Sequence, residues 1–203
     1  MSELTQLCDQ VRVCTKCDLA KGRTNAVPGE GPENAAIMLI GEAPGFHEDR
    51  EGRPFVGASG KFLDELLAGI NLKREQIYIC NVIKCRPPQN RDPQPDEMET
   101  CKPYLDRQIE LIKPKVIITI SRFAMARWFP DRKIGEIHGK PKKVGNLVVL
   151  PMYHPAAALH QPSLKKTLQE DFGKIPQILK DMAHLQEEQE QKKPEPPQQL
   201  SMF

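Results

Sequence analysis

Four short apolar runs separated by helix-like segments constrain the fold of this chain most strongly. The runs have strand length and are rich in Ile and Val, which is typical of strands buried on both faces of a sheet. They cover residues 36–40, 77–83, 116–120 and 147–152. Apolar residues recur at helical spacing in residues 60–70, 96–112, 121–128 (with Ser121 as the candidate N-cap) and 164–185. This alternation predicts an α/β fold, a three-layer sandwich with a short, mostly parallel four-stranded central sheet flanked by helices.

The chain is long enough, at 203 residues, for one domain with its own core. We expect this domain to cover residues 1–185. Residues 186–203 begin with a stretch rich in Gln, Glu and Pro that has too few apolar side chains to offset the entropy of ordering, so we expect a disordered tether. Without the tether's four Glu and two Lys the net charge rises from +2 to +4. A mildly basic domain permits contact with nucleic acid without requiring it.

Cysteine spacing and compartment together indicate an inorganic site. The chain has no apolar run long enough to span a membrane, and its N-terminal segment lacks the order of a signal peptide, so we expect a cytosolic protein with no membrane partner. In a reducing compartment the pair Cys14 and Cys17, two residues apart, is typical of a metal site or a redox motif. Cys85 and Cys101 each stand where the chain leaves or enters a regular element, as two further ligands of a shared set would.

The segment after the first predicted strand, GEAPGFHEDREGRPFVGASG, carries candidate site residues. Ligands of open α/β sheets gather beyond the carboxyl ends of the strands. The glycines and proline favour a tight loop whose backbone N–H groups can face an acceptor, while Glu42, Glu48 and Phe55 supply two carboxylates and an aromatic face. The alternative is a structural turn with solvated acidic side chains.

Asn81 and His154 follow the second and fourth predicted strands at the same edge of the sheet. The amide of Asn81 offers a donor and an acceptor together, as reading an imide-type base edge requires, and its alternative role is a turn cap. A lone His such as His154 is more often structural than catalytic. Convergence with Glu42 and Asn81 favours a functional role.

Three segments, GEAPGFHEDREGRPFVGASG, NVIKCRPPQNRDPQPDEMETC and YHPAAALHQP, resemble the type 4 uracil-DNA glycosylases, the iron–sulfur branch of the uracil-DNA glycosylase superfamily. The resemblance covers residues 4–185 and includes the cysteines in order. It implies a monofunctional hydrolase that removes uracil from DNA and leaves an abasic site for base excision repair. It also implies a 4Fe-4S cluster, for which four thiolates are the usual ligands, although zinc is a competitor for an isolated C-x2-C pair. The implied ligands are Cys14, Cys17, Cys85 and Cys101.

The resemblance assigns base recognition to three side chains. Phe55 would stack on the flipped uracil. Asn81 would donate to O4 and accept from N3–H, a pair of hydrogen bonds that cytosine cannot form. Glu48 would occupy the space that the C5 methyl group of thymine needs.

The resemblance also implies how the bond is broken. His154 and backbone N–H groups of Gly41, Glu42 and Ala43 would donate to O2 of the departing uracil anion. Other branches of the superfamily place an Asp at the position of Ala43, so Glu42 is the remaining carboxylate. It would position or activate the attacking water, or stabilise the sugar cation, and the sequence does not separate these roles.

Four residues are candidates for contact with DNA outside the pocket. The resemblance suggests that Leu159 enters the space vacated by the flipped base, and ordinary loop packing is the alternative. Lys84, Arg86 and Arg91 are candidates for phosphate contacts, which would make affinity depend on salt, and a solvated face is the alternative for each.

The C-terminal pentapeptide resembles the motif that binds the bacterial sliding clamp, with Met where Leu is commoner. A tether raises its effective concentration near a partner on DNA. The residues are Gln199, Leu200, Ser201, Met202 and Phe203.

Two other functions compete with uracil excision. One is a superfamily member that binds uracil-containing DNA with little turnover, or captures the sugar covalently through an inserted His, but no basic, His-containing insertion follows Gly57. The other is a cluster-bearing redox or nucleic-acid sensor with the same fold. In all cases we expect a monomer associated with the nucleoid.

Overall fold

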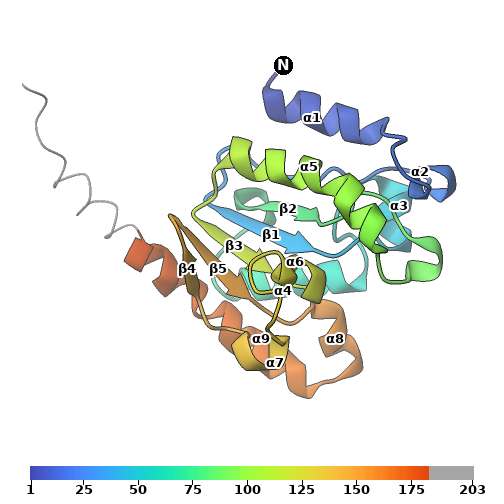
Figure 1. The fold of residues 1–203 in the computed structure, drawn as a ribbon. Helices are drawn as coiled ribbons and strands as arrows, with labels where there is room; N and C mark the ends of the chain where they lie inside the picture. The colour runs from blue at the N-terminus through green and yellow to red at the C-terminus, as the bar shows by residue number, and fades with distance from the viewer. Residues whose placement is uncertain (183–203) are drawn as a thin grey trace, which may run out of the picture.

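The central sheet contains one strand more than the sequence predicts. The computed structural model describes residues 1–182, so the expected clamp-binding segment lies outside the described residues. Within them the sheet order is β2-β1-β3-β5-β4 (Figure 1). The strands are β1 Ile37–Gly41, β2 Tyr78–Asn81, β3 Val116–Thr119, β4 Lys142–Val144 and β5 Leu147–Pro151. The predicted α/β class and mostly parallel sheet are confirmed, because only β4 runs antiparallel to its neighbour.

The sequence did not predict strand β4, because this strand has no apolar pattern. Its three residues are all exposed, and two of them are lysines. It pairs with β5 through a two-residue loop in which Gly145 takes a φ of 62°, a value that favours glycine. Edge position and lysine content suit a strand that must not pair with other chains.

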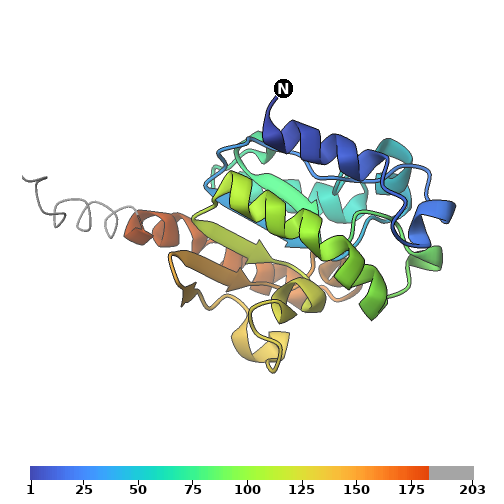
Figure 2. The same ribbon diagram turned by 45° about the horizontal axis from the view of Figure 1, so that its top comes forward.

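Helices cover both faces of the sheet (Figures 1 and 2). Helices α1 Glu3–Arg12 and α5 Pro95–Ile112 pack together on one side, and α4 Ala58–Ala68, α8 Pro155–His160 and α9 Ser163–Phe172 pack together on the other. Shorter elements are α2 Leu19–Gly22, α3 Phe46–Glu51, α6 Arg122–Ala126, α7 Ile134–Ile137, and the 3-10 turns η1 Arg74–Gln76 and η2 Pro88–Asn90. No helix within residues 1–182 has the length and apolarity to cross a membrane.

Several helix boundaries differ from the predicted ones. The segments after β1 and β5, expected as loops, contain the single-turn to two-turn helices α3 and α8. The helix expected over 164–185 is interrupted, because α9 ends at Phe172 and a second helical segment starts at residue 175. The predicted cap is confirmed: Ser121 Oγ accepts a hydrogen bond from the backbone N–H of Ala124 at 3.0 Å.

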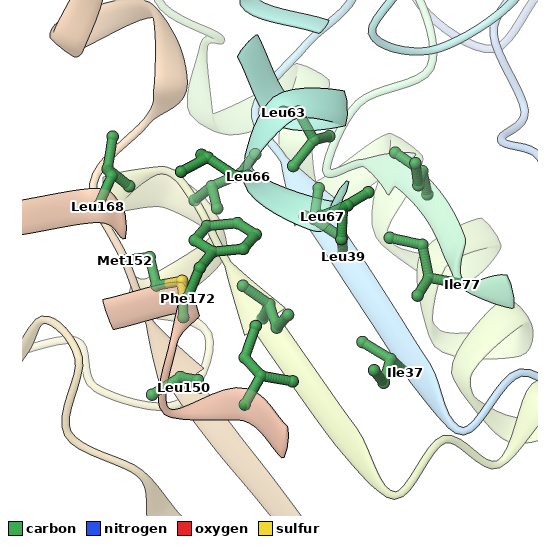
Figure 3. Close-up of a cluster of buried hydrophobic side chains, with 14 of the residues drawn as sticks. Ile37, Leu39, Leu63, Leu66, Leu67, Ile77, Leu150, Met152, Leu168 and Phe172 are labelled. Atoms are coloured by element: carbon green, nitrogen blue, oxygen red, sulfur yellow. The ribbon is translucent and has the colours of Figure 1, made fainter. Parts of the chain in front are cut away.

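Two apolar layers, one on each face of the sheet, form the core. Figure 3 shows the layer in which Leu63 and Leu67 of α4 and Phe172 of α9 meet Leu39 of β1, all at most 1% exposed. Burying each such side chain contributes about 1.5–3 kcal/mol. The opposite layer lies under α1 and α5. This packing fixes the strands, so their carboxyl ends form a rigid platform.

Candidate active site

The carboxyl ends of three strands deliver residues to one cavity. Gly41 and Asn81 end β1 and β2 as a register pair, and His154 follows β5. The arrowheads of β1 and β2 in Figure 1 point toward the side on which α3 and α8 lie. The cavity, of about 280 Å³, is lined by Glu42, Ala43, Pro44, Gly45, Glu48, Phe55, Ser59, Asn81, Pro87, Asn90, Arg91, His154 and Ala156. The structure therefore brings together the residues predicted for the pocket, with Gly41 directly behind it.

Phe55 provides one wall of the cavity and is held in an unusual backbone conformation. It is 6% exposed, its φ is 53°, and its ring stacks on the His154 ring with centroids 5.8 Å apart. Arg74 fixes this conformation, because its guanidinium donates to the carbonyls of Pro54 and Phe55. A positive φ costs about 1–3 kcal/mol in a non-glycine residue, so the surrounding contacts must maintain it.

Arg74 is a functional residue that the sequence does not reveal. It lies in η1, far from every motif, and its side chain is 14% exposed. Glu30 anchors it with Oε1 2.7 Å from Nε. Only the folded chain brings this ion pair beneath the aromatic wall.

Glu48 is a fixed carboxylate at the edge of the cavity. Its two oxygens accept hydrogen bonds of 3.1 Å from the backbone N–H groups of Gly45, Val56 and Gly57. Hydrogen bonds of this kind hold the carboxylate in one orientation. Through these hydrogen bonds Glu48 connects α3 to the segment that follows Phe55.

Asn81 presents an amide oxygen that lacks a hydrogen-bond partner among residues 1–182. It is 2% exposed, and Oδ1 is buried without a hydrogen-bond partner among residues 1–182. A Cβ at position 41 would lie 2.3 Å from this oxygen and 2.8 Å from Phe55 Cζ, so Gly41 makes room for both side chains. An unpaired buried polar atom costs about 1–3 kcal/mol, which a ligand donor could recover.

His154 is a neutral imidazole with a defined tautomer. Burial lowers its pKa to about 4, against the opposing effect of the Glu48 charge. The backbone N–H of Ala156 donates to Nδ1 at 3.0 Å. A neutral imidazole with an acceptor at Nδ1 carries its proton on Nε2, so Nε2–H is available as a donor.

Glu42 and Ala43 complete the wall above β1. Burial raises the pKa of the Glu42 carboxyl, with a further upward effect from Asp92 and an opposing one from Arg122. Among the described residues the backbone N–H of Ala43 has no hydrogen-bond partner. The site thus combines a carboxylate, a free backbone donor and an imidazole donor around an aromatic wall.

The prediction that Lys84 contacts DNA phosphates is wrong. Lys84 is 1% exposed, and Nζ donates to the backbone oxygen of Asn81 at 2.8 Å and to Gln108 Oε1 at 2.7 Å. Its ammonium lies in the interior because a buried hydrogen-bond network uses it. Sequence alone could not reveal this, since a lysine after a strand usually reaches solvent.

The other candidates for DNA contact lie at accessible positions. Arg91 lines the cavity, but its guanidinium forms a bidentate pair with Glu97 at 2.6 and 2.9 Å. Arg86 donates to Asn90 Oδ1 at 2.8 Å. Leu159 of α8 is 49% exposed.

The four predicted cysteine ligands line a second, narrow cavity. They meet there with Arg23, Lys84 and Tyr104, and are Cys14, Cys17, Cys85 and Cys101. Arg23 Nη1 donates to Cys85 Sγ at 2.9 Å, and the backbone N–H of Lys84 donates to Cys101 Sγ at 3.3 Å. Within residues 1–182 no group of three or more Cys, His, Asp or Glu is arranged to hold a single metal ion. Four thiols that line one cavity are the donor set that a cluster of four irons would take, with one thiolate to each iron.

The fold and the cavity are those of an α/β protein whose candidate site lies beyond the carboxyl ends of parallel strands. The chain belongs to the uracil DNA glycosylase superfamily, whose sequence model matches residues 28–180. It is 50% identical to the type-4 uracil-DNA glycosylase of Sulfurisphaera tokodaii, over 88% of this chain and 86% of that protein. The type-4 enzymes of Archaeoglobus fulgidus and Thermotoga maritima are 48% and 41% identical, over 88% and 85% of this chain and 94% and 92% of their own.

Proposed function

We propose that this protein is a monofunctional uracil-DNA glycosylase of type 4, which hydrolyses the bond between uracil and deoxyribose and leaves an abasic site for base excision repair. One observation carries the proposal beyond the family likeness. The Oδ1 atom of Asn81 is buried and has no hydrogen-bond partner among residues 1–182, and it lies beside the aromatic wall of a cavity that also holds a neutral imidazole. An imide edge, with its N–H donor and carbonyl acceptors, satisfies such a set of groups.

Recognition begins when the uracil nucleotide leaves the base stack, at a cost of about a few kcal/mol. Stacking on Phe55 returns about 1–3 kcal/mol. Asn81 accepts from N3–H and donates to O4. Cytosine offers an unprotonated N3 and an amino group at these places, so both hydrogen bonds fail. Glu48, locked by three backbone N–H groups, excludes the methyl group of thymine sterically.

Cleavage sends the electron pair of the glycosidic bond into the uracil ring and leaves a cationic sugar. Charge then develops at O2, where His154 Nε2–H and the backbone N–H of Ala43 donate. Water adds its hydroxyl to the sugar carbon, and its proton ends on the uracil ring. Glu42 is the carboxylate of this step, and it orients or activates the water or stabilises the cation.

The four cysteines would hold a 4Fe-4S cluster, which when bound supplies a cross-link between segments far apart in the sequence. Cys14 and Cys17 follow the end of α1, Cys85 follows β2, and Cys101 lies in α5. Because Cys85 comes four residues after Asn81, the cross-link would hold the base-reading end of β2. Support comes from the all-sulfur donor set and the shared cavity.

We also propose contacts beyond the flipped base, with the rest of the DNA and with a partner protein. Arg86 and Arg91 would contact phosphates, and Leu159 would enter the space left by uracil, as its exposure on α8 permits. The segment from Gln199 to Phe203 would bind a sliding clamp and keep the enzyme at the nucleoid. We propose that the enzyme acts as a monomer.

A uracil-containing oligonucleotide tests the function. The expected result is an abasic site, cut by alkali, at uracil and not at thymine or cytosine in matched strands. An intact uracil strand despite tight binding would favour the alternative of a binding or sensor protein. Equal cutting of all three strands would contradict the recognition scheme.

A further inference from the structure

An exposed aromatic ring with two guanidinium groups lies beside the mouth of the cavity. Phe46 opens α3, is 47% exposed, and follows Gly45, which lines the cavity. The Cζ atoms of Arg50 and Arg86 lie 5.6 and 5.1 Å from the centre of its ring. Arg50 belongs to α3 and Arg86 to the loop after β2. We call Phe46, Arg50 and Arg86 the rim cluster.

The rim cluster is joined to the cavity wall on both sides. Arg86 Nε donates to Oδ1 of Asn90, which lines the cavity. Glu48, two residues after Phe46, lines the cavity and anchors α3 through its backbone hydrogen bonds. The two arginines are therefore held at the border of the site and do not extend from a remote surface.

The charges of Arg50 and Arg86 are not neutralised within residues 1–182. Every other arginine there forms an ion pair with a carboxylate, apart from Arg23, which donates to Cys85 Sγ and to the backbone oxygen of Arg12. Arg91, predicted for the same role, is paired with Glu97. Arg50 and Arg86 therefore differ from nearly all other arginines of residues 1–182 in having no carboxylate partner, which leaves their guanidinium groups available to an anion.

We propose that the rim cluster binds the sugar-phosphate backbone of the DNA strand next to the flipped nucleotide. Arg50 and Arg86 bind phosphates, and Phe46 holds both guanidinium groups in place through cation–π contacts. A guanidinium stacked on an aromatic ring keeps its N–H fork free for phosphate oxygens. The inference rests on the proposed function, because a base in the cavity forces the adjoining backbone to cross this border.

The test measures how affinity for a single-stranded oligonucleotide depends on salt. The probe carries one 2′-fluorinated deoxyuridine, which resists cleavage because fluorine destabilises the sugar cation. The variants are Arg50→Gln, Arg86→Gln, their double variant and Phe46→Leu. The control is Arg132→Gln, because Arg132 pairs with Glu136 at 3.2 Å beside α7, which lies apart from α3 (Figure 1).

Each lost phosphate contact should lower the slope of log affinity against log salt by about 0.7. The double variant should therefore lose about 1.4 from the slope and bind roughly tenfold more weakly at moderate salt. Phe46→Leu should reduce both affinity and slope, since unheld guanidinium groups bind phosphates less well. Arg132→Gln should match the wild type.

Distinct outcomes separate this inference from the proposed function. Wild-type protein that leaves an ordinary uracil oligonucleotide uncut contradicts the function itself. Wild-type protein that excises uracil, together with a double variant of unchanged slope, contradicts only the role of the rim cluster. Weaker binding by Phe46→Leu at an unchanged slope would overturn the assignment of Phe46 to holding the arginines.

Discussion

At the scale of single residues, hydrogen bonds that are already made decide what each side chain can still do. Both carboxylate oxygens of Glu48 already accept hydrogen bonds from backbone N–H groups, and Nδ1 of His154 accepts one from the backbone N–H of Ala156. Asn81 has kept Oδ1 without a partner among the described residues. The free groups that face the cavity are therefore few and of known polarity, as selective recognition requires.

Replacing Asn81 by Asp should relax discrimination against cytosine. Aspartate loses the donor for uracil O4 and gains an acceptor for the cytosine amino group. We expect kcat/KM for uracil to fall by roughly 10- to 100-fold, which corresponds to about 1–3 kcal/mol, and the uracil-to-cytosine ratio to fall with it. Asn146→Asp, in the exposed turn between β4 and β5, is the control. An unchanged ratio would refute the geometry proposed for Asn81.

His154 should make stability depend on pH in a defined window. Its pKa is about 4 in the folded protein, below the ordinary value of 6.5, so the unfolded chain binds more protons between these values. The free energy of unfolding should therefore rise with pH from about 4 to 6.5, and its slope against pH should not exceed the value for a difference of one bound proton. This contribution is complete above pH 6.5. His154→Asn keeps an N-cap acceptor but cannot titrate, so its curve should be flatter.

Urea unfolding at a series of pH values checks this prediction. His160→Asn, at the exposed end of α8, serves as the control and should keep the wild-type slope. Equal slopes for His154→Asn and the wild type would show that another group causes the pH dependence of stability in this range.

At the scale of elements, short helices and close backbone contacts set the position of the aromatic wall. Helix α4 starts beside Phe55, and a Cβ at Gly60 would lie 1.8 Å from the Phe55 carbonyl oxygen. Arg74 of η1 donates a hydrogen bond to the same carbonyl oxygen. The left-handed conformation of Phe55 is thus imposed by two elements at once.

Gly60→Ala should displace this wall. The added methyl group cannot fit against backbone atoms, so we expect about 1–3 kcal/mol of lost stability and reduced uracil excision. Gly22→Ala is the matched control, because a Cβ there meets nothing within 4 Å, and alanine favours a helix. Chemical denaturation and excision rates measure both effects. A Gly60→Ala protein as stable and active as the wild type would contradict the contact.

At the scale of the whole molecule, the cysteine cavity joins parts that the sheet does not hold together. It lies between the segment after α1, the loop after β2 and α5. Gln108 of α5 extends this link inward through Lys84 to the backbone of Asn81. A group bound to the cysteines would therefore stabilise the recognition end of β2 as well as the N-terminal segment.

Cys85→Ser should remove most bound iron and sulfide and lower the melting temperature by several degrees, because metal binding contributes to folding free energy. Cys8→Ser is the control, since Cys8 lies outside the cysteine cavity. Elemental analysis, visible absorbance and thermal unfolding provide the readouts. Colourless wild-type protein loaded with zinc would contradict the cluster.

Deleting residues 199–203 should abolish binding to a sliding clamp while sparing excision on short oligonucleotides. The domain that forms the cavity keeps all its residues in this variant, so the two activities should separate. A pull-down with purified clamp and a parallel excision assay give the answer. Undiminished clamp binding would refute the motif.

The α/β class, the four parallel strands and the convergence of Glu42, Asn81 and His154 were predictable from the sequence, because apolar periodicity and strand ends are local properties of the chain. The burial of Lys84, the hydrogen bond from Arg74 to Phe55 and the edge strand Lys142–Val144 became visible only in the folded protein. Arg74 and Lys84 bind residues far away in the sequence, among them Phe55 and Gln108. Strand β4 pairs with the adjacent β5, but it has no apolar pattern that would predict it. A side chain's charge is local, but its exposure and its hydrogen-bond partners depend on how distant elements pack.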